Sequence, residues 1–299
     1  MKILLTGVSG RVGQNTAREL LDNGYAVCGF DRAPLPEDLR GQVEMHYGEI
    51  TDRYALLRAA AGCEAVVHLA AIPNPGRWDD MLFPVNVTGT QNVLAAAEAH
   101  GIKKFAHAST AAAYGIVYAT QPLDPQYLPM DEKHPSLPQD LYGLSKILNE
   151  ETCATYTRRT GMTTVCLRLT MVLDLEKMAT HRWGKRRLQM SREWRDDALW
   201  TYIDDRDTAR AFRLAIENAP PGHHVALIAA RDSLTPYDIR DLVRQHFPAI
   251  ADQADHLEPH GSCYDTREAE RIFGFVAQHS WRDVPELRAV EEEILAEQG

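Results

Sequence analysis

Short apolar runs alternate with helix-like stretches along the first 170 residues. Such runs are typical of buried parallel strands, because neighbouring layers cover both faces of the sheet. They lie in KILLT (2–6), YAVCGF (25–30), VEMHYGEITD (43–52), AVVHLAA (65–71), KKFAHASTAAAYG (103–115) and TTVCLRL (163–169). Helical periodicity and capping residues predict helices over 11–22, 86–101 and 140–161. The alternation predicts an α/β protein with a doubly wound parallel sheet.

The pattern changes at two places. Residues 116–140 hold five prolines, which exclude a regular helix and predict a long ordered loop, a feature that is usually functional in a compact domain. After residue 170 the strand–helix alternation weakens, although a helix over 202–220, a strand over 223–229 and a proline-initiated helix over 235–248 are predicted. We therefore expect a main domain over 1–170 and a small lobe over 171–299 that is built onto the same sheet.

Composition and charge narrow the classes of function. The 299-residue chain carries a net charge of −10, which argues against nucleic acid or an anionic membrane as the main partner. No apolar run is long enough to span a bilayer, and the first residues show no signal-peptide pattern, so a cytoplasmic location is expected. The five cysteines form no C-x-x-C pair and the 12 histidines show no metal-ligand spacing, so buried thiols and no metal site are expected.

Three glycines follow the first predicted strand at positions 7, 10 and 13. Their order between a strand and a helix is typical of dinucleotide-binding turns, where Gly7 permits the turn, Gly10 lets the backbone approach a pyrophosphate, and Gly13 lets helix and strand pack closely. Asp31 ends the next strand, where a carboxylate accepts hydrogen bonds from the ribose hydroxyls and repels a 2′-phosphate. The sequence therefore predicts NAD, with NADP left possible because Arg11 or Arg32 can neutralise a phosphate.

A second candidate group lies in "LYGLSK" (141–146), where Tyr142 and Lys146 are one helical turn apart. A free tyrosine is too weakly acidic to act as a base at neutral pH, and a neighbouring ammonium together with a positive nicotinamide ring favours the phenolate. The third member of such a group is a hydroxyl that binds the same substrate oxygen as the tyrosine, and it can come from Ser109 or Thr110.

These motifs together resemble the extended branch of the short-chain dehydrogenase/reductases, the family of sugar epimerases, dehydratases and dehydrogenases with a Rossmann-type fold. The resemblance rests on TGVSGRVG (6–13), Asp31, HLAA (68–71), NVTGTQNVL (86–94), STAAAYG (109–115), YGLSK (142–146), LRL (167–169) and YIDDRDTARA (202–211). It implies catalysis by Thr110 rather than Ser109, with Tyr142 as base and Lys146 as its partner. It also implies a homodimer formed through the helices at 86–100 and 141–160.

The resemblance and the predicted strand ends give two sets of binding residues. Those expected to bind the cofactor are Gly7, Ser9, Gly10, Arg11, Val12, Gly13, Asp31, Arg32, Glu49, Ile50, Leu69, Ala70, Ala71, Asn86, Ala108, Tyr142, Lys146 and Leu169. Those expected to bind the substrate are Pro73, Thr110, Ala111, Tyr142, Thr170 and, on the basis of charge alone, Arg182. Asn86 supports an active-site water network or is simply a surface or capping residue, and the residues alone leave both open.

Departures from the family pattern narrow the reaction. Dehydratases carry Asp-Glu after the catalytic threonine, where this chain has Ala111 and Ala112, so dehydration is not expected. Nucleotide-sugar epimerases often carry an arginine where this chain has Trp200, and their Asn and Tyr-Gly-Pro after strand six are missing from "RLTMVLD" (168–174). The missing residues are ones that contact the diphosphate of a nucleotide sugar. Their loss indicates a smaller substrate, such as a free sugar, sugar acid or polyol, as in the uronate dehydrogenases of the family.

The motifs and their departures from the family pattern therefore favour an NAD-dependent oxidoreductase that acts on a sugar or sugar acid. An epimerase with tightly bound NAD uses the same residues and is the alternative. A non-catalytic dinucleotide sensor is a third hypothesis, against which the complete Thr110–Tyr142–Lys146 set counts. The cluster Arg182, Lys185, Arg186 and Arg187 either binds an acidic substrate or forms a solvated basic face, and the second is favoured.

Overall fold

A seven-stranded parallel sheet forms the centre of the computed structural model, which describes residues 1–76 and 79–297. The strand order is β3-β2-β1-β4-β5-β6-β9, and all paired neighbours run parallel. The strands are β1 (Lys2–Thr6), β2 (Ala26–Asp31), β3 (Glu44–Tyr47), β4 (Ala65–His68), β5 (Lys104–Thr110), β6 (Thr163–Leu169) and β9 (His223–Ile228). The predicted doubly wound α/β fold is confirmed.

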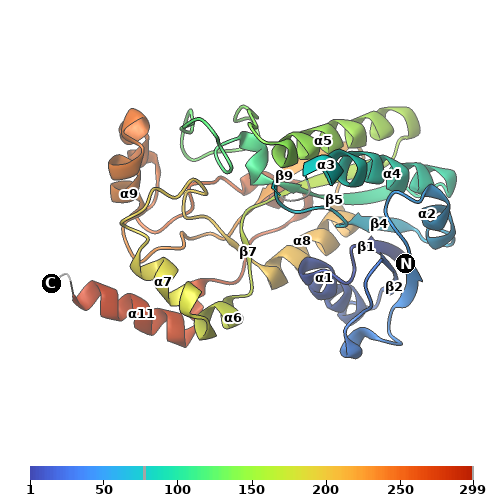
Figure 1. Cartoon of the computed structure of the whole chain (residues 1–299), viewed down its shortest axis with the longest axis horizontal. Helices are drawn as coiled ribbons and strands as arrows, with labels where there is room; N and C mark the ends of the chain where they lie inside the picture. The colour runs from blue at the N-terminus through green and yellow to red at the C-terminus, as the bar shows by residue number, and fades with distance from the viewer. Residues whose placement is uncertain (77–78, 298–299) are drawn as a thin grey trace.

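Helices cover both faces of this sheet (Figure 1). Alternate residues of β1 show why: Ile3 and Leu5 pack on one side and Leu4 on the other, and all three are buried. The first side is covered by α1 (Arg11–Asp22) and α8 (Asp205–Asn218). The second side is covered by α2 (Arg53–Ala59), α4 (Gly89–Ala99) and α5 (Leu141–Thr160).

The helix predicted over 86–101 is longer than its sequence pattern indicates. It begins with α3 (Asp79–Leu82), continues through a π-helical segment (Phe83–Thr88) and ends as α4. Proline has no amide hydrogen and is therefore usually found in the first turn of a helix. Pro84 instead lies inside the wider turns of the π-helical segment. Asn86 also lies in this segment, and its side chain points into the protein.

The C-terminal part adds β9 to the main sheet and places further elements beyond the carboxyl ends of the strands (Figure 1). A parallel pair joins β7 (Val172–Leu173) to β8 (Ile203–Asp204). The remaining helices are α6 (Leu175–Thr180), α7 (Arg182–Gln189), α9 (Ile239–His246), α10 (Arg267–Phe273) and α11 (Pro285–Ala296). None of the helices in residues 1–76 and 79–297 combines the length and apolar character that a membrane span requires.

A second predicted helix start was also wrong. The helix over 235–248 was expected to begin at Pro236, but α9 begins at Ile239. Asp238 is the N-cap, and its carboxylate accepts a hydrogen bond from the amide of Arg240. The capping carboxylate therefore sets the helix start, and Pro236 lies in the turn before it. The predicted long loop over 116–140 is present and packs against this region through Ile116, Leu128 and Met130.

Candidate active site

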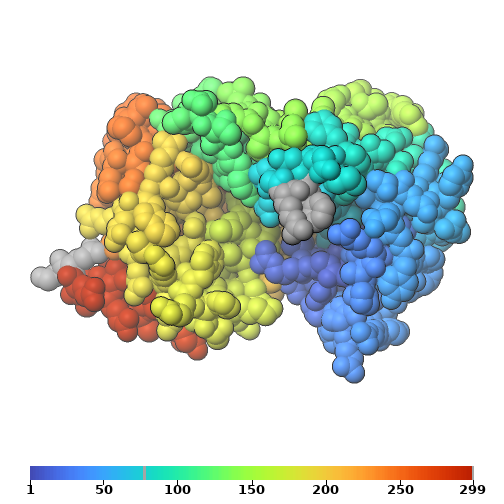
Figure 2. Space-filling view, viewed as in Figure 1, coloured from blue at the N-terminus to red at the C-terminus, as the bar shows by residue number. Residues whose placement is uncertain are grey.

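Two adjoining cavities lie at the carboxyl ends of the central strands, where β1 and β4 are neighbours. In open α/β sheets, ligands bind where the order of the strands reverses, as it does here. One cavity of about 610 Å³ follows the turn after β1 and the end of β2, and the other, of about 460 Å³, follows the ends of β5 and β6. Leu69 and Ala71 line both cavities. Figure 2 shows the surface hollowed between the blue N-terminal segments and the yellow segments that follow β6.

The turn after β1 has no room for side chains at two of its glycines. Gly7 has a φ of +73°, and a Cβ atom there would lie 2.7 Å from the amide nitrogen of Ala70. A Cβ atom on Gly13 would lie 2.0 Å from the carbonyl oxygen of Gly7. Gly10 caps α1 without a side chain, so the first amides of the helix are available to an anion in the adjoining cavity. This turn therefore fits a phosphate group.

The Asp31 carboxylate is fixed at the rim of the larger cavity. It accepts hydrogen bonds of 3.0 Å from the backbone amides of Ser9 and Ala33. Arg32 and Glu49 line the same cavity, with 3.9 Å between their charged groups. The negative charge of Asp31 thus lies where the ribose of a dinucleotide is expected, and the neighbouring Arg32 is paired rather than free.

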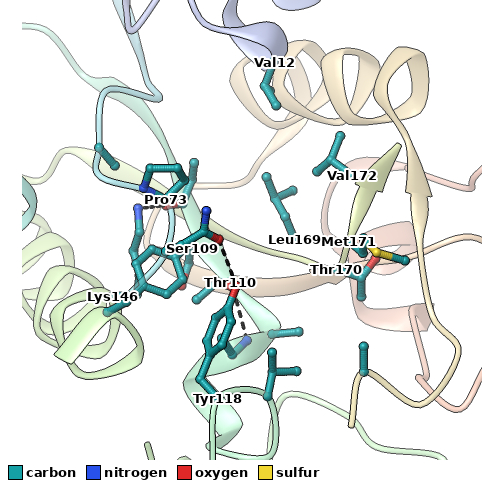
Figure 3. Close-up of a pocket in the computed structure, with 18 of the residues that line it drawn as sticks. Val12, Pro73, Ser109, Thr110, Tyr118, Lys146, Leu169, Thr170, Met171 and Val172 are labelled. Atoms are coloured by element: carbon teal, nitrogen blue, oxygen red, sulfur yellow. Dashed lines mark hydrogen bonds between the residues drawn. The ribbon is translucent and has the colours of Figure 1, made fainter. Parts of the chain in front are cut away.

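The three predicted catalytic side chains meet in the smaller cavity. Thr110 ends β5, while Tyr142 and Lys146 lie in the first turns of α5, which Asp140 caps by accepting a 2.8 Å hydrogen bond from the Gly143 amide. The Lys146 ammonium donates a 2.7 Å hydrogen bond to the carbonyl of Ala108 and lies 5.8 Å from the centre of the Tyr142 ring. Figure 3 shows Lys146 and Thr110 on one side of the cavity and Thr170, Met171 and Val172 on the opposite wall.

Burial dominates the acid–base properties of this group. It raises the pKa of Tyr142 to about 12, although a hydrogen bond with Thr110 acts in the opposite direction. Burial also lowers the pKa of Lys146 to about 8, which leaves the ammonium mostly protonated at neutral pH. The expected lowering of the Tyr142 pKa is therefore reversed in the protein alone, because desolvation outweighs the hydrogen bond with Thr110.

The structure distinguishes the two candidate hydroxyls of β5. Ser109 donates a 2.6 Å hydrogen bond to Glu150, and this carboxylate is paired with Arg168 at 2.8 Å. Thr110 accepts a hydrogen bond from the Ala112 amide at 3.1 Å and contacts the Tyr142 hydroxyl. Ser109 lines the cavity but its hydroxyl is committed to this buried ionic network, and Thr110 is the hydroxyl beside Tyr142.

Two buried histidines lie behind Lys146. The rings of His68 and His107 stack with their centres 5.2 Å apart, and His68 is hydrogen-bonded to Thr6 and Thr90. Neither ring nitrogen of His107 has a partner among the described residues. Burial, reinforced by the Lys146 charge, lowers the pKa of His68 to about 3 and that of His107 well below its usual value.

These histidines predict an acid-sensitive fold. Both stay neutral when folded, whereas the unfolded chain takes up protons below pH 6.5, so the free energy of unfolding is expected to fall as pH drops from 6.5 towards 4 by up to about 1.4 kcal/mol per pH unit per histidine. His107→Leu should reduce this slope in urea unfolding at pH 7, 6 and 5, and exposed His181→Leu is the control. An unchanged slope in the His107 variant would contradict the assignment.

Most of the predicted binding residues line the two cavities, and three do not. Gly13 packs under the glycine turn. Asn86 is buried rather than on a helix surface, so the surface or capping interpretation was wrong; its amide group bonds both backbone groups of Ile72 and the Ser145 hydroxyl. Arg182 is exposed at the start of α7 and lies outside both cavities.

Several residues that line the smaller cavity were not identified from the sequence. They are Asn74, Ala112, Val117, Tyr118, Met171, Val172, Ala198, Thr201 and Tyr264. Tyr118 lies in the predicted proline-rich loop, and that loop was the only signal that pointed to it. Trp200 is buried, and its indole donates to the carbonyl of Ser191, so it supplies no charge to the cavity.

The five cysteines are free and buried, as expected. One group in residues 1–76 and 79–297 places metal-ligand atoms within 4.8 Å of one another: Cys28, Glu44 and His46. Lys2 already donates a 2.8 Å hydrogen bond to Glu44 and occupies this carboxylate. These residues therefore form an ion pair at the edge of the sheet, and we assign no metal site to them.

Comparison with known proteins adds independent findings. Residues 3–227 match the model of a family described as NAD dependent epimerase/dehydratase. The chain is 31% identical to a 2-alkyl-3-oxoalkanoate reductase of Stenotrophomonas maltophilia over 84% of this chain and 76% of that protein. It is 29% identical to an L-arabinose 1-dehydrogenase (NAD(P)(+)) of Haloferax volcanii, over 77% and 89%. A short-chain dehydrogenase/reductase superfamily protein of Agrobacterium tumefaciens, solved with bound NAD, superposes with a TM-score of 0.73 at 25% identity, covering 100% and 99%.

Proposed function

The chain belongs to the NAD-dependent epimerase/dehydratase family, and from this membership we propose that it is an NAD-dependent dehydrogenase of a sugar, sugar acid or related polyol. The observation that carries the proposal is the meeting of Thr110, Tyr142 and Lys146 in a cavity that adjoins the glycine turn and Asp31. The larger cavity fits the adenosine and phosphates of NAD, and the smaller one fits the nicotinamide end together with a small substrate.

The residues of the smaller cavity divide the reaction among them. NAD supplies the acceptor for the hydride that leaves the substrate carbon. Tyr142 as phenolate takes the proton of the substrate hydroxyl, so that an alcohol becomes a carbonyl compound. Thr110 holds the same oxygen by a hydrogen bond. Lys146 keeps a positive charge beside Tyr142, and with the positive charge of bound NAD it offsets the desolvation that raises the pKa of Tyr142.

Asp31 is expected to set the preference for NAD over NADP. Replacing it with serine removes the charge that opposes a 2′-phosphate, so the ratio of kcat/KM for NADP to that for NAD should rise about tenfold or more, or by about 1.4 kcal/mol. Initial rates with both cofactors measure this ratio. Asp38→Ser is the matched control, because Asp38 pairs with Arg18 on the surface. An unchanged ratio in the Asp31 variant would remove Asp31 from the cofactor site.

The proposal also includes the organisation of the chain. We assign NAD binding to residues 1–170. Residues 171–299 form a substrate lobe that contributes Met171, Val172 and Thr201 to the wall of the smaller cavity and shares the sheet through β9. A homodimer through α4 and α5 is supported by an exposed apolar row on α5 formed by Leu141, Leu144 and Leu148.

A cytoplasmic location is supported by the five free thiols, which are typical of reducing compartments.

A second candidate substrate class follows from the walls of the smaller cavity. Val117, Met171 and Val172 give it an apolar side, and the Stenotrophomonas relative is named for the reduction of alkyl-substituted oxo acids. The same Tyr142 hydroxyl would then donate its proton to the carbonyl oxygen while the hydride moves in the opposite direction.

The test is an absorbance assay of the purified protein at the NADH band. With NAD, it would be challenged with aldoses, uronic acids, aldonates and nucleotide sugars, and with NADH it would be challenged with 3-oxo acids. NADH formed with a sugar or sugar acid supports the proposal. Oxidation of NADH by oxo acids alone replaces it with the second candidate. A sugar isomerised with no release of NADH makes the protein an epimerase, and binding of NAD with no turnover of any compound makes it a sensor.

A further inference from the structure

Asn74 and Tyr118 lie together at the substrate end of the smaller cavity, next to the catalytic tyrosine. The Tyr118 hydroxyl donates a 2.9 Å hydrogen bond to the side-chain oxygen of Asn74. The Tyr118 ring approaches the Tyr142 ring edge-on, with 6.3 Å between their centres. Figure 3 shows Tyr118 projecting into the cavity from the loop after β5. The pair thus joins the segment after β4 to the proline-rich loop beside the reacting group.

This pair offers amide donors that the neighbouring threonines lack. Thr170 and Thr201 also line the cavity, but their hydroxyls donate to the backbone carbonyls of Ile228 and Ala198. Asn74 uses only its side-chain oxygen within the described part of the chain, so its amide N–H groups are available as donors. The Tyr118 oxygen still has lone pairs that can accept. Together they offer a donor and an acceptor to one ligand group.

The backbone at Tyr118 is held in an unfavourable conformation. Its φ is +67°, in the left-handed region that a bulky side chain rarely adopts. Tyr118 is 42% exposed, so burial of an apolar ring does not account for this geometry. Residues held in such conformations are concentrated at ligand sites, where the surrounding structure fixes the direction of a side chain. Here the conformation directs the hydroxyl to Asn74 and the cavity.

We propose that Asn74 and Tyr118 bind a second hydroxyl group of the substrate, on the carbon next to the one that is oxidised. A hydroxyl both accepts and donates, which matches the amide donor of Asn74 and the acceptor oxygen of Tyr118. The pair therefore selects vicinal diols and polyols, including aldoses, over compounds with a single hydroxyl. This inference rests on the proposed dehydrogenase function and specifies the substrate class of its active site.

The test compares aldoses with their 2-deoxy counterparts. NADH formation would be followed with D-glucose, D-galactose and D-arabinose, and with the three sugars that lack the hydroxyl at carbon 2. In the unmodified protein, kcat/KM should be about three- to tenfold higher for the sugars with the hydroxyl, as expected for one hydrogen bond to a neutral group. Tyr118→Phe and Asn74→Leu should each reduce this ratio towards one, while the Kd of NAD from fluorescence titration stays unchanged.

The control is Tyr127→Phe, which lies in the same loop but bonds Asp131 outside the cavity, and its ratio should equal that of the unmodified protein. A ratio that persists in both the Tyr118 and the Asn74 variants overturns the inference, as does a ratio of one in the unmodified protein. In the second case the proposed dehydrogenase function survives. NAD binding without any NADH formation instead removes the dehydrogenase function itself.

Discussion

Tyr142→Phe is expected to lower kcat by about 10²–10⁴-fold, the usual contribution of a positioned acid–base group. The change removes only the hydroxyl, and the ring of Tyr142 stays in place against Leu82 and Ala112. Binding of NAD should therefore persist, because the glycine turn and Asp31 are untouched. Turnover is measured as NADH formation on the substrate found by the screen, and NAD binding by fluorescence titration.

Tyr156→Phe is the matched control for this substitution. Tyr156 lies in the same helix and is also buried, but it faces the hydrophobic core and not the cavity. It should lose no more than a few-fold in kcat. Full activity of the Tyr142 variant, with NAD still bound and thermal unfolding unchanged, would show that another group takes the proton.

Arg168→Met is expected to lower the free energy of unfolding by about 3–5 kcal/mol. Arg168 and Glu150 are each only 8% exposed and form two hydrogen bonds, of 2.8 and 2.9 Å. The guanidinium also lies 4.9 Å from the centre of the Tyr114 ring. Removing it leaves the Glu150 carboxylate buried with only Ser109 as a partner, and this desolvated charge causes most of the loss. Urea unfolding at pH 7 measures the change.

Two further variants separate the buried charge from lost packing. Adding Glu150→Leu to Arg168→Met removes the orphaned carboxylate and should recover a large part of the stability, since an apolar pair of similar volume often replaces a buried ion pair. The exposed pair of Arg158 and Glu151 is the control, and Arg158→Ala should cost less than about 1 kcal/mol. A loss from Arg168→Met as small as this would mean that water reaches the pair.

The sequence contained enough information for the doubly wound parallel sheet and the position of the cofactor turn. Apolar runs, capping residues and glycines are local signals, and β1, α1, β6 and α5 begin and end at or within one residue of where they were predicted. Thr110 could then be placed beside Tyr142, because parallel strands have their carboxyl ends at one edge of the sheet and the helix that follows β5 begins at that edge. These features depend on short stretches of chain or on the general geometry of parallel sheets.

Other features depend on contacts between distant segments and have no local signal. The π-helical turns around Pro84 form where the segment packs against α5, and the burial of Asn86 follows from that packing. The Tyr118–Asn74 contact joins two loops whose residues are 44 positions apart. Arg182 was expected at the substrate because of charge alone, and charge does not say which way an exposed helix faces.

The place of β9 at the edge of the sheet has a consequence for biosynthesis. β6 pairs with β5 on one side and with β9 on the other, so its second edge is covered only by residues 223–228. During synthesis on the ribosome, the apolar β6 emerges well before this partner and exposes an open strand edge that can pair with other nascent chains. Ribosome-associated chaperones, or slow translation over residues 170–222, would thus act on this protein at a defined interval in its synthesis.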